Sequence, residues 1–126
     1  MPVILQVALG GAIGAVLRYL AGGAALRLLG SGFPYGTMLV NIIGAFLMGV
    51  AAIYLMERMD GGFARFAPFW MAGVLGGFTT FSAYSLDAFF LLERGRFGAA
   101  AIYMGGSVIL AMLALVAGMA IARMIS

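Results

Sequence analysis

Four long apolar runs alternate with short polar turns along the chain, and they cover residues 3–29, 36–56, 67–92 and 97–125. A helix rises about 1.5 Å per residue and needs about 20 residues to cross the hydrocarbon of a bilayer, so each run is long enough to span a membrane. The connections carry Gly, Pro and charged residues typical of turns, at 31–34, 57–62 and 93–96. The pattern predicts an all-α membrane protein whose residues 1–126 form a single four-helix transmembrane domain.

The third run contains the polar segment Gly-Gly-Phe-Thr-Thr-Phe-Ser at 76–82. An exposed backbone N–H or C=O in hydrocarbon costs several kcal/mol, so non-helical backbone persists there only inside protein or beside a wet cavity. We therefore expect the third helix to be broken near its middle, where something is bound or conducted. Gly76 and Gly77 can let the helix open and aim freed carbonyls inward. Alternatively, they only permit close helix crossing, as we expect for Gly10-xxx-Gly14 and Gly73-xxx-Gly77.

Composition supports the membrane assignment and excludes several chemistries. The chain is 65% hydrophobic and only 9% charged, which is not the composition of a soluble domain. It has no Cys and no His, so disulfides, thiolate ligands and redox, haem or zinc chemistry are not expected. No basic region precedes the first run, so we expect that run to be retained rather than cleaved as a signal peptide. The net charge of +3 comes from arginines and is interpreted as membrane-face charge, with no nucleic-acid partner.

Positive charges are divided evenly between the two sides of the predicted bundle. One side holds the terminal amine with Arg58, Arg65 and Arg123, and the other holds Arg18, Arg27, Arg94 and Arg96. Orientation normally follows the side richer in Lys and Arg, so this tie predicts insertion both ways and an antiparallel, dual-topology dimer. The alternative is that the tie is chance and another feature fixes one orientation.

Polar side chains inside the spans are expensive and are therefore functional candidates. Thr37 and Asn41 lie four residues apart near the start of the second span, and Tyr103 and Ser107 repeat that spacing in the fourth. Alternating topology brings both starts to one end of the subunit. Ordinary hydrogen bonding between helices is the competing interpretation of these residues.

That same end also receives Arg18 and Asp87. The donors there outnumber the acceptors, so the sequence predicts a water-filled vestibule suited to an anion. Arg18 can instead be an interfacial arginine that snorkels to the membrane surface.

Two aromatic residues follow the polar segment. Phe81 and Tyr84 lie three residues apart on one helix face, beside Thr79, Thr80 and Ser82. Aromatic ring edges carry the positive end of the quadrupole and can contact an anion, although packing is the commoner role of such a pair. Freed carbonyls from two antiparallel copies would suit a monovalent or hard cation.

Three motifs, in this order along the chain, resemble those of the Fluc (CrcB-like) fluoride channels. They are Gly-Ala-Val-Leu-Arg-Tyr at 14–19, Tyr-Gly-Thr-Met-Leu-Val-Asn at 35–41, and the segment at 76–82. The resemblance covers essentially the whole chain. It implies passive, fluoride-selective export from the cytoplasm through the inner membrane. It also implies an antiparallel homodimer with two fluoride pores and a structural sodium ion at its centre.

The resemblance also assigns residues to roles. Asn41, Phe81 and Tyr84 correspond to fluoride-pore residues, together with Thr37, Tyr103 and Ser107. Arg18 and Asp87 correspond to the vestibule, and the backbone carbonyls of Gly76 and Thr79 correspond to the sodium ligands. The chain departs from the family pattern at three positions, where a phenylalanine, a hydroxyl residue and a serine are common: Tyr84, Ala83 and Ala111. The Tyr84 hydroxyl could donate to fluoride or hinder it.

Two other functions compete with that of a channel. A small, dual-topology, proton-coupled multidrug transporter needs a carboxylate in its first span, and residues 1–29 contain no Asp or Glu. A non-conducting partner subunit of a two-gene channel would explain Tyr84 and Ala111, but it would more often show a charge bias and a decayed Asn41. An enzyme is least expected, because no cluster of nucleophile, base and orienting group is visible.

Overall fold

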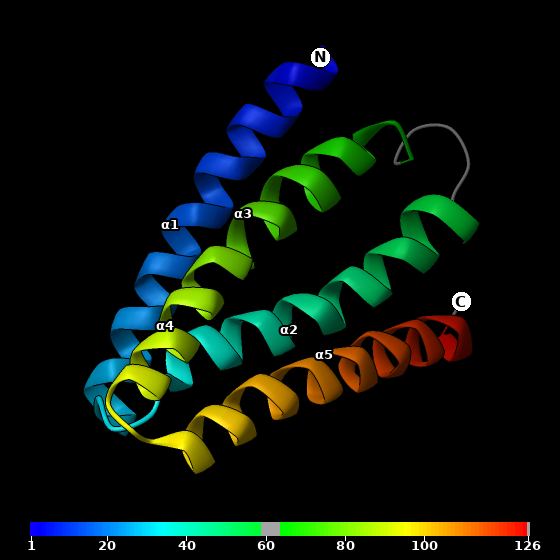
Figure 1. Cartoon of the computed structure of the whole chain (residues 1–126). Coiled ribbons are helices and arrows are strands. Elements are labelled where there is room, and N and C mark those ends of the chain that lie inside the picture. The colour runs from blue at the N-terminus through cyan, green and yellow to red at the C-terminus, as the bar shows by residue number, and fades with distance from the viewer. Residues whose placement is uncertain (59–63, 126) are drawn as a thin grey trace.

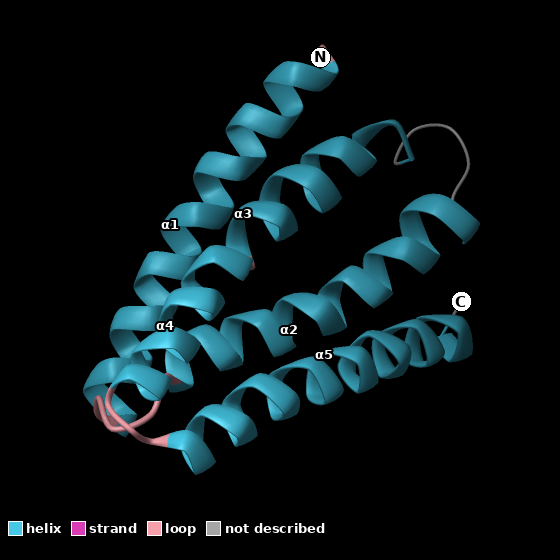
Figure 2. Cartoon of the chain, viewed as in Figure 1, coloured by secondary structure: helices cyan, strands magenta, loops and turns pink. Residues whose placement is uncertain are grey.

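The computed structural model describes residues 1–58 and 64–125, and its regular elements there are all helical (Figures 1 and 2). Four helices are long and apolar enough to cross a membrane: Val3–Leu29, Tyr35–Met56, Pro68–Glu93 and Phe97–Ile125. These bounds lie within one residue of the predicted runs. Residues 59–62 of the predicted second connection lie outside the described part of the chain.

The spans comprise several local helix types. The first is α1 (Val3–Leu29), and the second is α2 (Tyr35–Ala51) followed by the π-helical η1 (Ala52–Arg58). After the short η2 (Ala64–Phe66), the third span runs through the π-helical η3 (Pro68–Leu75), α3 (Gly76–Phe78) and α4 (Phe81–Glu93). The fourth is α5 (Phe97–Ile125). In Figure 1 the α1–α2 and α4–α5 connections lie together at one end, as alternating topology predicts.

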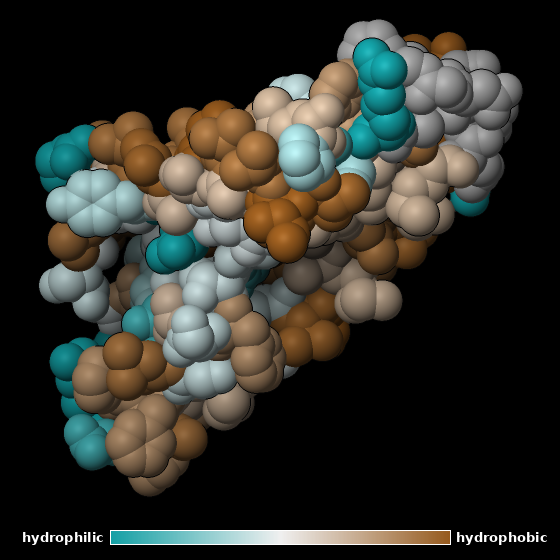
Figure 3. Space-filling model, turned by 90° about the horizontal axis from the view of Figure 1, so that it is seen from above, coloured by the Kyte–Doolittle hydropathy of each residue, from teal (hydrophilic) through white to brown (hydrophobic). Residues whose placement is uncertain are grey.

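The third span has different neighbours before and after its break. Its first half, η3, packs mainly against α1, whereas α4 packs against α5; α2 packs most extensively against α5. Most large apolar side chains face outward, which is the arrangement expected where lipid rather than water surrounds the helices. Figure 3 shows this apolar surface and a recess at one end, where hydrophilic side chains gather.

Glycines allow α1 and η3 to touch through their backbones. A Cβ atom on Gly73 would lie 2.9 Å from the Cα of Gly10, and one on Gly77 would lie 2.7 Å from the carbonyl oxygen of Gly11. Distances this short are not found for real Cβ atoms. The predicted close crossing through Gly10-xxx-Gly14 and Gly73-xxx-Gly77 is therefore confirmed.

The break itself lies slightly later than the glycines. Gly76 and Gly77 are helical, whereas Thr79 and Thr80 are extended, with φ/ψ of −88°/157° and −151°/126°. The predicted break within 76–82 is therefore present, but the backbone leaves the helix at the threonines and not at the glycines. Gly77 uses its lack of a side chain for contact with α1, whereas a Cβ on Gly76 would meet only the Met71 carbonyl of its own span, at 3.4 Å. The exposed backbone groups of the threonines can be hydrogen-bonded by side chains.

A buried glutamine closes the start of the third span. The first N–H groups of a helix have no partner within the helix. Gln6, only 4% exposed, accepts from the Phe69 N–H at 3.2 Å and donates to the Met1 carbonyl at 3.1 Å. One side chain of α1 thus satisfies a backbone donor that would otherwise be costly in the membrane.

We expect Gly73→Ala to destabilise the bundle, because the added methyl group must push η3 away from α1. Overpacking of this kind costs about 1–3 kcal/mol. Gly11→Ala is the matched control, since a Cβ there meets nothing within 4 Å. The measurement is the midpoint of thermal unfolding in detergent, monitored by size-exclusion chromatography, for the two variants. Equal midpoints for both would contradict the close backbone crossing.

Candidate functional site

Asn41 of α2 fills the break in the third span. Its Nδ2 donates to the Thr80 carbonyl at 2.9 Å, and its Oδ1 accepts from the Thr80 N–H at 2.8 Å. The carboxamide thus pairs with one residue as a second backbone strand would. Because a carboxamide nitrogen carries two hydrogens, one donor of Asn41 is left for another acceptor.

Several backbone carbonyls lose their usual helical donors at this break, and those of Gly76 and Thr79 are among them. The Thr80 N–H, which would reach the Gly76 carbonyl in a continuous helix, donates to Asn41 instead. The Ala83 N–H, which would reach the Thr79 carbonyl, donates to the Thr80 Oγ1 at 3.2 Å. Gly76 and Thr79 are the two residues whose carbonyls were expected to hold sodium. The break therefore frees backbone oxygens at the predicted positions.

Arg18 of α1 contacts the same break. Its Nε donates to the Gly77 carbonyl at 3.1 Å, and its half-buried side chain lines a cavity of about 470 Å³ together with Thr37 and Thr80. The sequence placed Arg18 in a vestibule. In the structure it lines a cavity and also compensates a backbone carbonyl, so it is more than a snorkelling arginine.

Thr37, Asp87 and Tyr103 converge from α2, α4 and α5. The Thr37 hydroxyl donates to Asp87 Oδ2 at 2.7 Å, and the fully buried Tyr103 donates to the same oxygen across a longer 3.4 Å. The predicted convergence at this end of the subunit is therefore present. The hydroxyls of Thr37 and Tyr103 both donate to a carboxylate, and the sequence alone did not indicate this shared acceptor.

The two aromatic candidates differ in exposure. Phe81 is 78% exposed, and its ring centroid lies 5.5 Å from that of the half-buried Tyr84. The Tyr84 hydroxyl donates to the Met104 carbonyl of α5 at 3.0 Å, and its ring lies 5.3 Å from that of Tyr103. The hydroxyl that distinguishes Tyr84 from phenylalanine is thus directed at α5 backbone. Sequence reasoning could not find Met104, because its acceptor is a main-chain oxygen.

Ser107 lies one turn along α5 from Tyr103. It is 5% exposed, and its Oγ has no hydrogen-bond partner among the described residues. A buried unpaired hydroxyl costs about 1–3 kcal/mol. Such a group is a donor that can be satisfied by a ligand.

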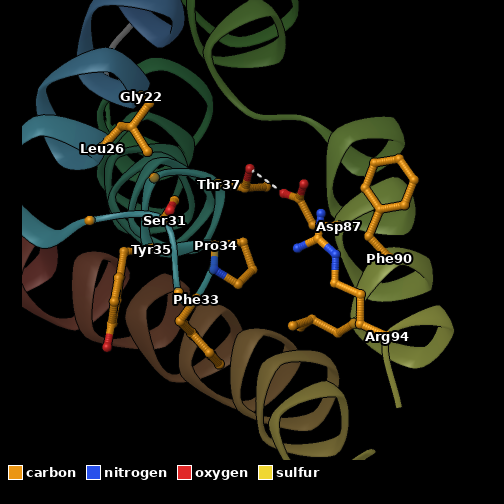
Figure 4. Close-up of a pocket in the computed structure, with 14 residues that line it drawn as sticks. Gly22, Leu26, Ser31, Phe33, Pro34, Tyr35, Thr37, Asp87, Phe90 and Arg94 are labelled. Atoms are coloured by element: carbon orange, nitrogen blue, oxygen red, sulfur yellow. Dashed lines mark hydrogen bonds between the residues drawn. The ribbon is translucent and has the colours of Figure 1, made fainter. Parts of the chain in front are cut away.

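Three cavities divide the predicted residues. Asn41, Thr79 and Phe81 line one of about 350 Å³, together with Ala111. Thr37 and Asp87 line a second of about 330 Å³ at the end of the bundle (Figure 4), and Arg18 lines the third with Thr37. The single chain thus places some expected residues at separate cavities, whereas others line none of the three: Tyr84, Tyr103 and Ser107.

The sequence was compared with known proteins. A family model described as "CrcB-like protein, Camphor Resistance (CrcB)" matches residues 5–119. A protein of Cereibacter sphaeroides named fluoride-specific ion channel FluC is 56% identical over 95% of this chain and 94% of its own length. Proteins of the same name from Rhizobium johnstonii and Caulobacter vibrioides are 50% and 46% identical, over 94% and 95% of this chain and 94% of their own lengths. The chain therefore belongs to the CrcB-like protein family.

Proposed function

We propose that the chain is a fluoride-selective ion channel that exports fluoride passively from the cytoplasm across the inner membrane. The observation that carries this function is the break in the third span, which Asn41 holds open beside the exposed ring of Phe81. The kinship with proteins named fluoride-specific ion channels supports it.

The donors at the site suit a small, strongly hydrated anion. A selective pore must replace the water around fluoride by hydrogen-bond donors while still letting the ion leave. The remaining Asn41 amide hydrogen and the unpaired Ser107 hydroxyl are neutral donors, and the edges of Phe81 and Tyr84 add weak positive potential. Neutral groups bind without the strong retention that a row of full charges would cause.

The functional unit we propose is an antiparallel, dual-topology homodimer in lipid. A second copy packed on this face would cover the exposed Phe81 ring and the apolar cavity beside it. A second, inverted copy is consistent with the even division of positive charges, the terminal amine included, between the two faces. In this arrangement each pore would be completed by residues of both subunits.

We also propose a structural sodium ion at the centre of the dimer. The carbonyls of Gly76 and Thr79, freed from their helical donors, are hard oxygen ligands, and two subunits would supply four of them. The described residues contain no group of three or more acidic side chains, so a cation site at the break would have to use such neutral oxygens. When bound, sodium would supply a fixed positive charge between the subunits.

The first test is fluoride efflux from liposomes that contain the purified protein alone, measured with a fluoride electrode. We expect rapid passive efflux of fluoride and no matching efflux of chloride. Efflux of both ions would contradict selectivity. An inactive but well-folded dimer would favour the partner-subunit alternative over the channel.

We expect Phe81→Ile to slow fluoride efflux by up to about tenfold. An aromatic edge contact is worth about 0.5–1.5 kcal/mol, and about 1.4 kcal/mol corresponds to a factor of ten in rate. Phe81 is 78% exposed in the subunit, so its replacement should leave the fold of the chain intact. Phe89→Ile, at an exposed position two turns further along α4, is the control. A wild-type rate for Phe81→Ile would remove this residue from the pore.

Sodium should stabilise the assembly. We expect the unfolding midpoint in detergent to rise with sodium concentration, because a ligand that binds only the folded state stabilises it by mass action. Potassium at equal ionic strength controls for general salt effects. Identical midpoints in the two salts would argue against the sodium site while leaving the channel function open.

Tyr84→Phe should leave fluoride selectivity unchanged, because the hydroxyl points to the Met104 carbonyl and not at a pore donor. The variant loses one hydrogen bond, worth about 0.5–1.5 kcal/mol of stability. Fluoride and chloride efflux, measured beside thermal unfolding, separate the two effects. A large loss of fluoride selectivity would show that the hydroxyl serves the permeating ion.

A further inference from the structure

A cavity of about 330 Å³ lies at the end of the bundle, between the connection that follows α1 and the end of α4 (Figure 4). Its lining includes Thr37 and Asp87, which are candidate site residues, and also Arg94, which the sequence counts only among the membrane-face charges. Of the described residues that line this cavity, Arg94 alone carries a positive charge.

The local backbone places Arg94 at the cavity. Helix α4 ends in a Schellman motif, in which the Gly95 N–H donates to Leu92 at 3.0 Å and the Arg96 N–H donates to Leu91 at 2.9 Å. Gly95 has a φ of 75°, a conformation that side chains other than glycine rarely adopt. The motif turns the chain sharply between the two arginines, so their side chains leave it at different places.

The two arginines have different partners. Arg96 Nη1 donates to the Gly32 carbonyl and so joins the connection after α4 to the one after α1. The guanidinium carbon of Arg94 lies 5.7 Å from the centroid of the Phe90 ring. In Figure 4 the Arg94 side chain runs toward Asp87. A guanidinium is weakly hydrated and stacks well on aromatic faces. Arg96 therefore holds the wall of the cavity in place, whereas the positive charge of Arg94 lies at the cavity itself.

The negative charge of Asp87 repels anions, and the positive charge of Arg94 can offset it. An anion that enters this cavity meets the Asp87 carboxylate, and the hydroxyls of Thr37 and Tyr103 already donate to that group. The described partners of Asp87 are these hydroxyls, whereas Arg94 rests on Phe90, so the two charges have separate partners. A cavity lined by one sign of charge changes the local concentration of ions of the other sign. Without a compensating cation, this mouth would repel anions.

We propose that Arg94, supported by Phe90, is the capture site for a small hard anion at this mouth. Its charge offsets that of Asp87 and raises the local concentration of fluoride before the ion reaches the membrane-buried donors. The inference rests on the proposed channel function and assigns one residue in it.

The test is the initial rate of fluoride efflux from liposomes at low and at high ionic strength. Arg94→Gln keeps a polar, unbranched side chain and removes the charge. We expect it to lower the rate roughly tenfold at low salt, at the lower end of electrostatic steering effects. The difference should shrink at high salt, because the Debye length falls from about 30 Å at 0.01 M to about 3 Å at 1 M. Arg94→Lys should keep most of the wild-type rate.

One further variant completes the set. Arg65→Ala is the matched control, since Arg65 rests on the Phe66 ring before the third span, away from this cavity. It should conduct as the wild type does.

The outcomes separate this inference from the proposed function. If the wild type conducts fluoride and Arg94→Gln shows the same efflux rate and the same salt dependence, the capture site is overturned and the channel function is not. An inactive wild type would overturn the channel function and this inference with it. The salt dependence of wild-type efflux is a second readout that needs no variant, and a rate unchanged between low and high salt would also overturn electrostatic capture.

Discussion

The structure depends on one constraint, which is that backbone polar groups inside hydrocarbon must find partners within the protein. A continuous helix satisfies this rule automatically, but the third span gives up that solution at Thr79 and Thr80. Asn41 replaces the missing hydrogen bond of the Thr80 N–H and also donates to the Thr80 carbonyl, and Arg18 compensates the Gly77 carbonyl. The break is therefore tolerated because neighbouring helices supply side chains of the right chemistry at the right depth. The same substitution of partners frees the carbonyls of Gly76 and Thr79.

The two halves of the third span are held by different interactions, close packing before the break and polar pairing after it. Glycines let η3 approach α1 until their backbones touch, which holds the first half of the span firmly. Beyond the break, α4 depends on side chains: Tyr84 bonds to α5, and Asp87 receives the hydroxyls of Thr37 and Tyr103. Groups that carry the candidate chemistry are thus also groups that hold α4 in place. A substitution among them changes position as well as chemistry, which is why exposed residues such as Phe81 are the cleaner probes.

Much of the fold could be read from the sequence, because hydropathy over about 20 residues is a strong signal and the spans agree with it to within one residue. The existence of a break was also visible in the polar segment at 76–82. Which residues of that segment leave the helix was not visible. A glycine pair signals either an opening or a close contact, and only the partner helix decides between them. The bond from Tyr84 to the Met104 carbonyl was out of reach for a similar reason. Main-chain acceptors look the same at every position of a sequence, and Arg94 gained its role only from the turn that Gly95 makes.

The change of neighbours along the third span has a consequence for how the protein is made. Because η3 rests on α1, the first half of that span can dock as soon as it enters the membrane. The second half finds its contacts on α5, which leaves the ribosome after the other three spans. The aromatic and polar groups of α4 therefore stay without their α5 partners until α5 has been made. The pathway can take its final form only after that step, so a chain that stops before α5 would insert three spans and still lack a finished conduit.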